Sequence, residues 1–261
     1  MRGRTLRSLL SLSVALSFAL PERGAAQSGS DEVKAPAWSL RLSAGAGIGT
    51  RDFELPRDGV IYENGTGIFP AADLGFELDQ RASAVLSVGL HARYQRSVGL
   101  NVVEHHIDGS TREQALRSQS IELAIAPAIR FDARGLWALA TSAGYRISDL
   151  RPEVHLETPG YFLGGPFLRI ELQVPIAPNT VRLRLGPELQ WVAQVGRDLI
   201  AQGVADSGVG AGAGASLELA LGQRWFVDVS YRELRVWVDS TDERSFQDVA
   251  RFVTARFSGS L

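Results

Sequence analysis

Residues 180–195, TVRLRLGPELQWVAQV, alternate apolar and polar side chains for longer than an ordinary soluble strand needs. Successive side chains of a β-strand point to opposite faces, so this stretch has two faces of different chemistry. One face holds Val181, Leu183, Leu185, Pro187, Leu189, Trp191, Ala193 and Val195. The other holds Arg182, Arg184, Gly186, Glu188, Gln190 and Gln194. The pattern predicts a strand with an apolar exterior on one side and a wet, charged interior on the other.

The same alternation recurs along the chain and predicts ten strands, with eight or twelve as the alternative counts. Each predicted strand keeps apolar residues on one phase and small, polar or charged residues on the other. In the ninth predicted strand, the sequence also allows the inward and outward positions to exchange near Trp237, which is a change of phase. The strands are expected at about residues 38–48, 67–78, 82–94, 121–131, 137–147, 162–174, 180–195, 209–221, 225–237 and 245–261.

Short and long connections alternate between these strands. The short turns fall at residues 79–81, 132–134, 175–179 and 222–223, and the long loops at residues 50–66, 95–118, 149–160, 196–208 and 239–244. An even strand number with this alternation is typical of a membrane barrel whose short turns face the periplasm and whose long loops face the outside. Because Asp108-Gly109 is a hairpin signal, residues 95–118 are expected to include an extended β-hairpin.

Aromatic residues on the apolar phase gather in two sets. The set near the short turns comprises Trp38, Phe76, Phe131, Trp137, Trp225 and Phe257. The set further along the strands comprises Tyr94, Tyr145, Phe162 and Trp191. Since a tilted membrane-spanning strand needs about 9–11 residues, this spacing predicts an aromatic girdle at each membrane interface.

The carboxy terminus ends on the apolar phase, with Phe257 and the final Leu261 among its outward residues. This ending resembles the assembly signal of bacterial outer-membrane β-barrel proteins, with Leu261 where phenylalanine is more usual. The resemblance covers residues 38–261 and is to a class, not to one family. It implies a closed antiparallel up-and-down transmembrane β-barrel, with the barrel assembly machinery as a partner during biogenesis.

A secreted soluble β-barrel or sandwich is the competing interpretation of the fold. It would bury the apolar phase in a core and expose the charged phase to water. Four prolines lie inside the proposed strands, where each removes a donor from the hydrogen-bond ladder. They are Pro70, Pro127, Pro166 and Pro187, and they are expected to mark bulges.

The amino terminus has the composition of a secretory signal peptide. Arg2, Arg4 and Arg7 precede an apolar run at residues 9–20, and small residues end at Ala26. We therefore expect a cleaved signal at residues 1–26, a polar periplasmic lead-in at residues 27–37 and the barrel at residues 38–261, in the cell outer membrane. The chain contains no cysteine, which excludes disulfide and thiolate chemistry.

Net charge and mean hydropathy restrict both the binding partners and the class of membrane protein that the sequence can represent. The 27 basic and 29 acidic residues give a net charge near zero, so no overall field indicates nucleic acid as a partner. The mean hydropathy is −0.00, too low for a helical membrane protein and suitable for a barrel that is apolar on alternate residues. Outer-membrane lipid and lipopolysaccharide are the expected surroundings, and the sequence identifies no ligand for the loops.

The predicted interior carries both signs of charge. Eight cations and seven anions fall on the inward phase: Arg41, Arg93, Arg130, Arg169, Arg182, Arg184, Arg232 and Arg256 with Asp73, Glu77, Glu122, Glu171, Glu188, Glu218 and Asp228. In a narrow barrel these side chains are expected to fill the lumen and pair with one another. A turn centred near residues 177–178 would place Glu171 opposite Arg184.

No residue is predicted to be catalytic, cofactor-binding or metal-binding, and no cofactor is expected. His91 is the one histidine on an inward strand position and is read as part of the polar lumen in preference to a general base. His105, His106 and His155 fall in loops without an evident chelating partner. The acidic residues near the last loop are read as solvated: Glu233, Asp239, Asp242 and Glu243.

Two enzyme classes share this architecture but are not matched residue by residue. Omptin proteases need acidic and Asp-His pairs at the extracellular rim, and lipid A deacylases need an outward histidine. Residues 208–214, GVGAGAG, belong to a strand and its loop and do not form a phosphate-binding loop before a helix.

The function predicted from the sequence is a non-enzymatic outer-membrane barrel with a polar, largely filled lumen. Its loops would serve envelope structure or surface interaction. A small diffusion channel is the first alternative, and a hydrolase at the barrel rim is the second.

Overall fold

The computed structural model describes residues 38–57, 60–105, 111–131, 137–152, 160–177, 180–201, 203–240 and 246–261. The predicted signal peptide at residues 1–26 and lead-in at residues 27–37 lie outside the described residues.

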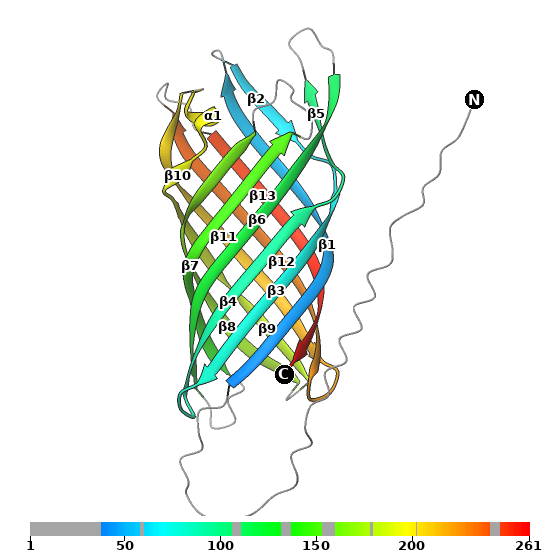
Figure 1. Ribbon diagram of the computed structural model, residues 1–261, viewed down its shortest axis with the longest axis vertical. Helices are drawn as coiled ribbons and strands as arrows, with labels where there is room; N and C mark the ends of the chain where they lie inside the picture. The colour runs from blue at the N-terminus through cyan, green and yellow to red at the C-terminus, as the bar shows by residue number, and fades with distance from the viewer. Residues whose placement is uncertain are drawn as a thin grey trace, which may run out of the picture. The chain divides into compact units, whose positions relative to one another are not determined.

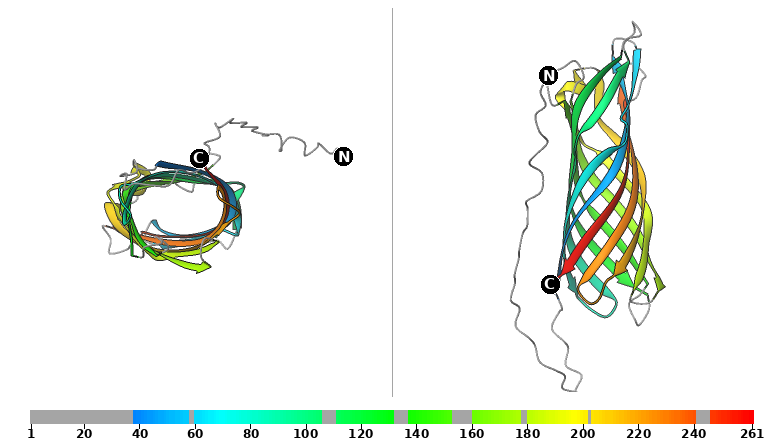
Figure 2. Two further views of the ribbon diagram at one scale, coloured as in Figure 1. Left: turned by 90° about the horizontal axis from the view of Figure 1, so that it is seen from below. Right: turned by 90° about the vertical axis from the view of Figure 1, so that its right-hand side faces the viewer.

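Within the described residues, ten antiparallel strands close into a barrel, which confirms the predicted number (Figure 1). The ring closes through pairing of β1 with β13 and of β8 with β9, so no strand edge is left open in the barrel wall (Figure 2). In ring order the strands are β1 (Trp38–Arg57), β3 (Phe69–Arg81), β4 (Leu86–Ser97), β6 (Thr111–Arg130), β7 (Ala138–Pro152), β8 (Tyr161–Ala177), β9 (Val181–Val192), β11 (Val204–Ala220), β12 (Trp225–Ser240) and β13 (Phe246–Ser260).

The remaining described elements all lie at one end of the barrel, which we call the loop end; the opposite end, where β1 starts and β13 finishes, is the turn end (Figure 1). They are β2 (Val60–Gly65), β5 (Leu100–His105), β10 (Gln194–Val195) and the four-residue helix α1 (Arg197–Ile200). No helix among the described residues is long and apolar enough to cross a membrane.

Two hairpins extend the barrel wall at the loop end. β5 pairs with the first part of β6, which confirms the predicted hairpin, although its tip at residues 106–110 lies outside the described residues. The prediction of a loop at residues 50–66 is wrong. β1 continues to Arg57 and pairs with β2, because Asp52 to Arg57 keep an antiparallel register with Gly65 to Val60.

The alternation of facing predicted from the sequence is present in the barrel wall. On β6, Ile121, Leu123 and Ile125 are exposed, while the intervening Glu122 and Ala124 are buried. The outward face is an apolar band with aromatic residues toward both ends, including Trp38, Phe131, Trp225 and Phe257 on one side and Tyr145 and Trp191 on the other. The apolar phase therefore points out of the barrel and the charged phase into it.

The first turn lies later than predicted. β3 continues through Arg81, and the chain reverses at residues 82–85, where the Leu86 carbonyl accepts hydrogen bonds from the Ala82 and Ser83 amides at 3.0 Å each. The Ser83 hydroxyl also accepts a hydrogen bond from the Leu86 amide at 2.9 Å. A serine that bonds its own backbone favours the turn over continued pairing.

The end of the stretch at residues 180–195 departs from the predicted facing. β8 pairs with Leu189 and Gln190 in one register, and its pairing with β10 is displaced by one residue, so Ala193 is left as a bulge. Because one extra residue reverses the facing beyond it, Val195 is buried and Gln194 is exposed. The prediction that Val195 faces outward and Gln194 inward is wrong.

The four prolines do not all mark bulges. Pro166 lies on β8 where its partner changes from β9 to β10, next to the bulge. Pro127 and Pro187 interrupt the β6–β7 and β8–β9 ladders, but the register is the same on both sides of each gap. Pro70 sits where pairing with β4 ends, and its carbonyl accepts a hydrogen bond from the Val98 amide at 2.8 Å. Each missing donor thus falls at an interruption or end of a ladder.

At the loop end the interior becomes apolar. Fourteen buried residues there form one cluster, which we call the plug: Phe53, Phe69, Leu100, Leu116, Leu150, Tyr161, Leu163, Val192, Val195, Leu199, Val204, Val236, Val238 and Phe246. β12 keeps its phase up to Val238, so the change of phase considered near Trp237 does not occur. Instead, at this end of β12 the charged residues lie on the outer face and the apolar residues on the inner face. Glu233 and Arg235 point outward, and Val236 points inward.

Candidate functional site

The polar lumen between the plug and the turn end holds the candidate site. Every strand of the wall presents alternate side chains to it, so residues distant in sequence meet there. All the charged residues predicted to face inward do so. Four more join them: Arg51, Asp79, Arg146 and Asp248.

Glu122 and Glu188 form the centre of the largest ion cluster, which we call the central lattice. Arg146 donates from Nε to Glu122 at 2.8 Å and approaches Glu188 with Nη1 at 2.5 Å. Arg169 approaches Glu188 at 2.8 Å and Glu122 at 3.0 Å. Arg232 bonds both oxygens of Glu188 at 2.7 Å and also contacts Glu122. Each carboxylate is therefore held by three guanidinium groups.

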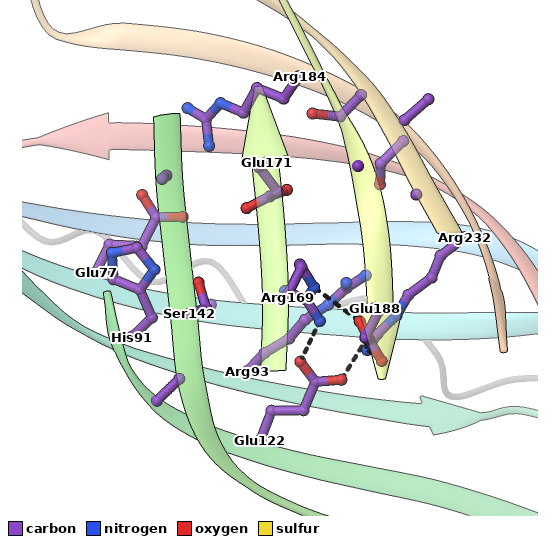
Figure 3. Close-up of a pocket in the computed structure, with 18 of the residues that line it drawn as sticks. Glu77, His91, Arg93, Glu122, Ser142, Arg169, Glu171, Arg184, Glu188 and Arg232 are labelled. Carbon is purple, nitrogen blue, oxygen red and sulfur yellow. Dashed lines mark hydrogen bonds and ion pairs between the residues drawn. The ribbon is translucent and has the colours of Figure 1, made fainter. Parts of the chain in front are cut away.

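The central lattice crosses the whole lumen. Glu122 lies on β6 and Arg232 on β12, which are five strands apart in the ring of ten. Figure 3 shows the side chains of Arg169 and Arg232 converging on Glu122 and Glu188. The Phe167 ring lies 4.7 Å from the Arg146 guanidinium carbon and covers the lattice on one side. These contacts link opposite walls of the barrel directly.

A second ion cluster, the turn-end cluster, surrounds Glu218 on β11. Its carboxylate accepts a hydrogen bond from Arg41 of β1 at 2.6 Å, contacts Arg184 and lies 3.6 Å from Arg182. The Arg41 guanidinium carbon also lies 4.2 Å from the centre of the Phe226 ring. Arg41 reaches across the mouth of the lumen from three strands away in the ring.

Asp73 and Asp228 hold two further arginines against the wall. Arg93 donates to Asp73 at 2.8 and 2.5 Å, and Arg256 donates to Asp228 at 2.7 Å. Arg93 comes from the strand next to Asp73, and Arg256 from the strand next to Asp228. These pairs line the lumen without crossing it.

Below the plug, Arg51 is fully buried and bonds Asp248 at 2.9 and 2.6 Å and the Ser118 hydroxyl at 2.6 Å. The Arg51 guanidinium carbon also lies 5.2 Å from the centre of the Tyr161 ring, which belongs to the plug. This layer therefore joins the polar lumen to the plug.

Two cavities separate these layers. One of about 130 Å³ lies between the central lattice and the turn-end cluster, lined by Glu122 and Glu188 on one side and Glu77 and Arg184 on the other. A smaller one of about 50 Å³ lies between the central lattice and Arg51. Both are large enough for water molecules, and their polar walls can bond them.

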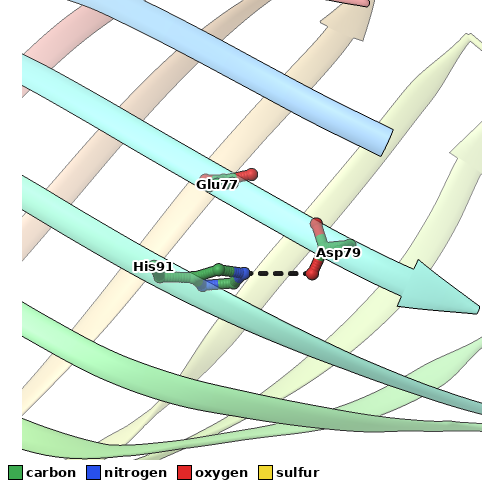
Figure 4. A group of neighbouring side chains, drawn as sticks. All are labelled: Glu77, Asp79 and His91. Carbon is green, nitrogen blue, oxygen red and sulfur yellow. Dashed lines mark hydrogen bonds and ion pairs between the residues drawn. The ribbon is translucent and has the colours of Figure 1, made fainter. Parts of the chain in front are cut away.

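His91 lies in the lumen near the turn end, as predicted. Its Nε2 is 3.2 Å from Asp79 Oδ1, and Glu77 is close to both (Figure 4). One ligand atom of each residue lies within 4.8 Å of the others, a donor set that a divalent cation could use. However, the Arg41 guanidinium lies 3.9 Å from Glu77, so a cation there would meet an existing positive charge. We therefore assign His91 to the polar lining.

The other predicted loop residues are not brought together among the described residues. His105 ends β5, while His106, His155, Asp242 and Glu243 lie outside the described residues. Asp239 is exposed near the end of β12. Glu233 is paired on the outer face with Arg235 at 3.2 Å and with Arg251 at 3.5 Å.

The predicted pair of Glu171 and Arg184 is wrong. Arg184 lies opposite Gln173, and the β8–β9 register places Glu171 level with Gly186. The turn is centred later than predicted, with the Ala177 carbonyl bonded to the Thr180 amide at 3.0 Å. Sequence reasoning also missed Arg146 at the centre of the lattice, although it alternates with the outward Tyr145 and could have been found by the same pattern.

Solved structures with a similar arrangement of strands are outer-membrane β-barrels. The translocator domain of the autotransporter NalP from Neisseria meningitidis is 13% identical, with a TM-score of 0.44, over 84% of this chain and 88% of that one. OprG from Pseudomonas aeruginosa is 8% identical, with a TM-score of 0.40, over 87% of this chain and 97% of that one. The β domain of the Bordetella autotransporter BrkA is 14% identical, with a TM-score of 0.40, over 87% and 99%.

No protein-family model matches the chain, and no curated protein matches its sequence. At the identities and TM-scores above, the solved structures carry no functional information. The barrel is defined by its own strand pairing.

Proposed function

We propose that the protein is a non-enzymatic barrel of the bacterial outer membrane with a closed lumen, and that it serves envelope structure or surface interaction through its loop end. The observation that carries the proposal is that side chains bridge the lumen at successive levels. These levels are the turn-end cluster, the central lattice and the plug.

The outward surface supports the membrane location. Leu185, Leu189 and Ile125 are large apolar side chains that stay exposed on the barrel wall. In water such a continuous apolar band would drive aggregation, whereas in a bilayer it contacts hydrocarbon. Phe257 on β13 and Leu261 beyond its end are also exposed on this surface.

The lumen favours a closed barrel over a small diffusion channel. A solute would have to pass the Arg232–Glu122 contact, which spans opposite walls, and then the fourteen buried apolar and aromatic side chains of the plug. Separating these groups would leave buried charges without partners, which favours the closed arrangement. The cavity of about 130 Å³ is bounded at both ends by ion clusters.

Planar-bilayer recording of the full-length protein tests this proposal. The wild-type protein is expected to give no steady single-channel steps. A variant with Glu122→Ala, Glu188→Ala, Arg232→Ala and Phe246→Ala is expected to conduct, because it removes the central lattice and part of the plug. Steady unit steps from the wild-type protein would favour the diffusion channel instead.

A further inference from the structure

Three of the described arginines lie together on the outer face at the loop end. Arg96, Arg117 and Arg151 lie on the neighbouring strands β4, β6 and β7, and we call them the arginine patch. Their outward direction follows from the buried residues beside them, Gln95 for Arg96 and Leu116 for Arg117. Leu150 is likewise buried beside Arg151.

The members of the arginine patch are close neighbours. Arg117 lies directly opposite Arg151, and Gln119 lies opposite both Arg96 and Asp149. Residues directly opposite on antiparallel strands have Cβ atoms about 4.5–5.5 Å apart, and diagonal ones about 7–8 Å. Like charges placed directly opposite are destabilising, so the Arg117–Arg151 position favours an anion between them.

Protein acids within the described residues do not neutralise the arginine patch. Asp149 accepts a hydrogen bond from Arg151 at 2.9 Å and from Gln119 at 3.0 Å, which uses both of its oxygens. In the described part of the chain, Arg96 and Arg117 form no ion pair, and the buried Nε of Arg117 has no hydrogen-bond partner. Among the described residues, two positive charges of the arginine patch are therefore uncompensated.

The opposite face at the same height is compensated. Arg251 bonds Asp52 at 2.6 Å and lies 3.5 Å from Glu233, and Arg235 lies 3.2 Å from Glu233. These residues lie on β1, β12 and β13. They provide a matched control with arginines in a similar position but with acidic partners.

The arginine patch borders directly on the lipid-facing band. Two residues below Arg96 is Tyr94, and Ile121 and Tyr145 continue the apolar surface on β6 and β7. A ligand that fills this surface needs acyl chains along the strands and negative charge at the level of the arginines. Both belong to a phosphorylated glycolipid of the outer leaflet.

We propose that Arg96, Arg117 and Arg151 bind the phosphates of lipid A, the anchor of lipopolysaccharide, while its acyl chains lie along Ile121 and Tyr145. This inference rests on the proposed outer-membrane location. It adds a specific lipid partner and a specific side of the barrel.

Binding of bisphosphorylated lipid A to the full-length protein in detergent micelles tests the proposal. A basic residue near an anionic lipid surface contributes about a fivefold change in affinity, so Arg96→Gln with Arg117→Gln should weaken binding about 25-fold. Arg235→Gln with Arg251→Gln should leave the affinity unchanged within about twofold. Dephosphorylated lipid A with the same acyl chains should bind the wild-type protein as weakly as lipid A binds the patch variant.

Equal affinity of the patch variant and the wild-type protein would overturn the proposal, as would wild-type binding that does not depend on the lipid phosphates. Arg151→Gln, a milder change, should weaken binding severalfold on its own. Each variant is first run on a gel with and without boiling. Loss of the heat-modifiable band in the wild-type protein would contradict the barrel itself, whereas a normal band with unchanged affinity contradicts only the arginine patch.

Discussion

At the scale of single residues, Glu188 illustrates how the lumen accommodates buried charge. Its side chain is 3% exposed and contacts Arg146, Arg169 and Arg232. Removing a carboxylate from water is costly unless good partners replace the lost hydration. The guanidinium groups of these three arginines supply those partners. If the Glu188 carboxylate is removed, each arginine in turn loses one of its own partners.

Glu188→Gln is therefore expected to lower the free energy of unfolding by about 3–5 kcal/mol, because three buried cations lose a common partner. Urea titration of the refolded protein in lipid vesicles measures this. Glu171→Gln is the matched control, since Glu171 lines the same cavity but forms no ion pair within the described residues. Equal losses for the two variants would contradict the central lattice.

Leu185→Arg tests the facing of the wall. Leu185 is exposed in the middle of β9, close to the expected midplane of the bilayer, so an arginine there should cost about 2–4 kcal/mol. Leu221→Arg, beyond the end of β11 near the turn end, should cost about 0–1 kcal/mol. The same unfolding titration compares them, and a Leu185→Arg variant that assembled with normal stability would show that this face is not in lipid.

At the scale of elements, β8 and β9 approach closely where Pro187 interrupts their ladder. A Cβ on Gly186 would lie 1.7 Å from the Ile170 carbonyl oxygen, so only glycine fits there. Gly214 lies directly opposite Gly186 on β11, and a Cβ there would meet the Tyr231 carbonyl oxygen at an ordinary 3.5 Å.

Gly186→Ala is consequently expected to destabilise the barrel by about 1–3 kcal/mol, whereas Gly214→Ala should change stability by less than about 0.5 kcal/mol. The midpoint of urea unfolding, measured for both variants side by side, gives the comparison. If the two substitutions had the same effect, the close approach of β8 and β9 would not exist in the folded protein.

The alternation of apolar and polar residues predicted the position of the strands well, but it did not predict where they end. It works in the membrane band because lipid and lumen demand opposite chemistries on alternate residues. It fails at Ala193, since a bulge shifts the facing without changing the local pattern. It also fails at residues 50–57, where β1 continues above the band and its inward Phe53 joins the plug.

The candidate site was predictable in composition but not in pairing. Alternation identified the inward arginines and acids, including Glu122 and Arg232. Their meeting across the lumen depends on which strands are five apart in the closed ring and on the stagger of each pair. Shear of this kind is not encoded in any single strand, which is why the Glu171–Arg184 prediction was wrong by two residues.

At the scale of the whole molecule, the plug and the central lattice close the lumen independently. Phe246 is fully buried in the plug and lies 5.1 Å from the Tyr161 ring centre. Phe246→Ala should cost about 3–5 kcal/mol through the cavity it leaves. It should nevertheless stay silent in planar-bilayer recordings, because the lattice remains; conduction by this single variant would show that the plug alone closes the barrel.

The central claim is that the apolar outer face of a ten-stranded barrel contacts the outer membrane. Electrophoretic mobility of the membrane-extracted protein, with and without boiling, combined with fractionation of the cell envelope, tests it most directly. We expect a heat-modifiable band in the outer-membrane fraction, because a closed barrel keeps its strand pairing in detergent until it is heated. A soluble periplasmic protein with the same mobility before and after boiling would contradict the claim.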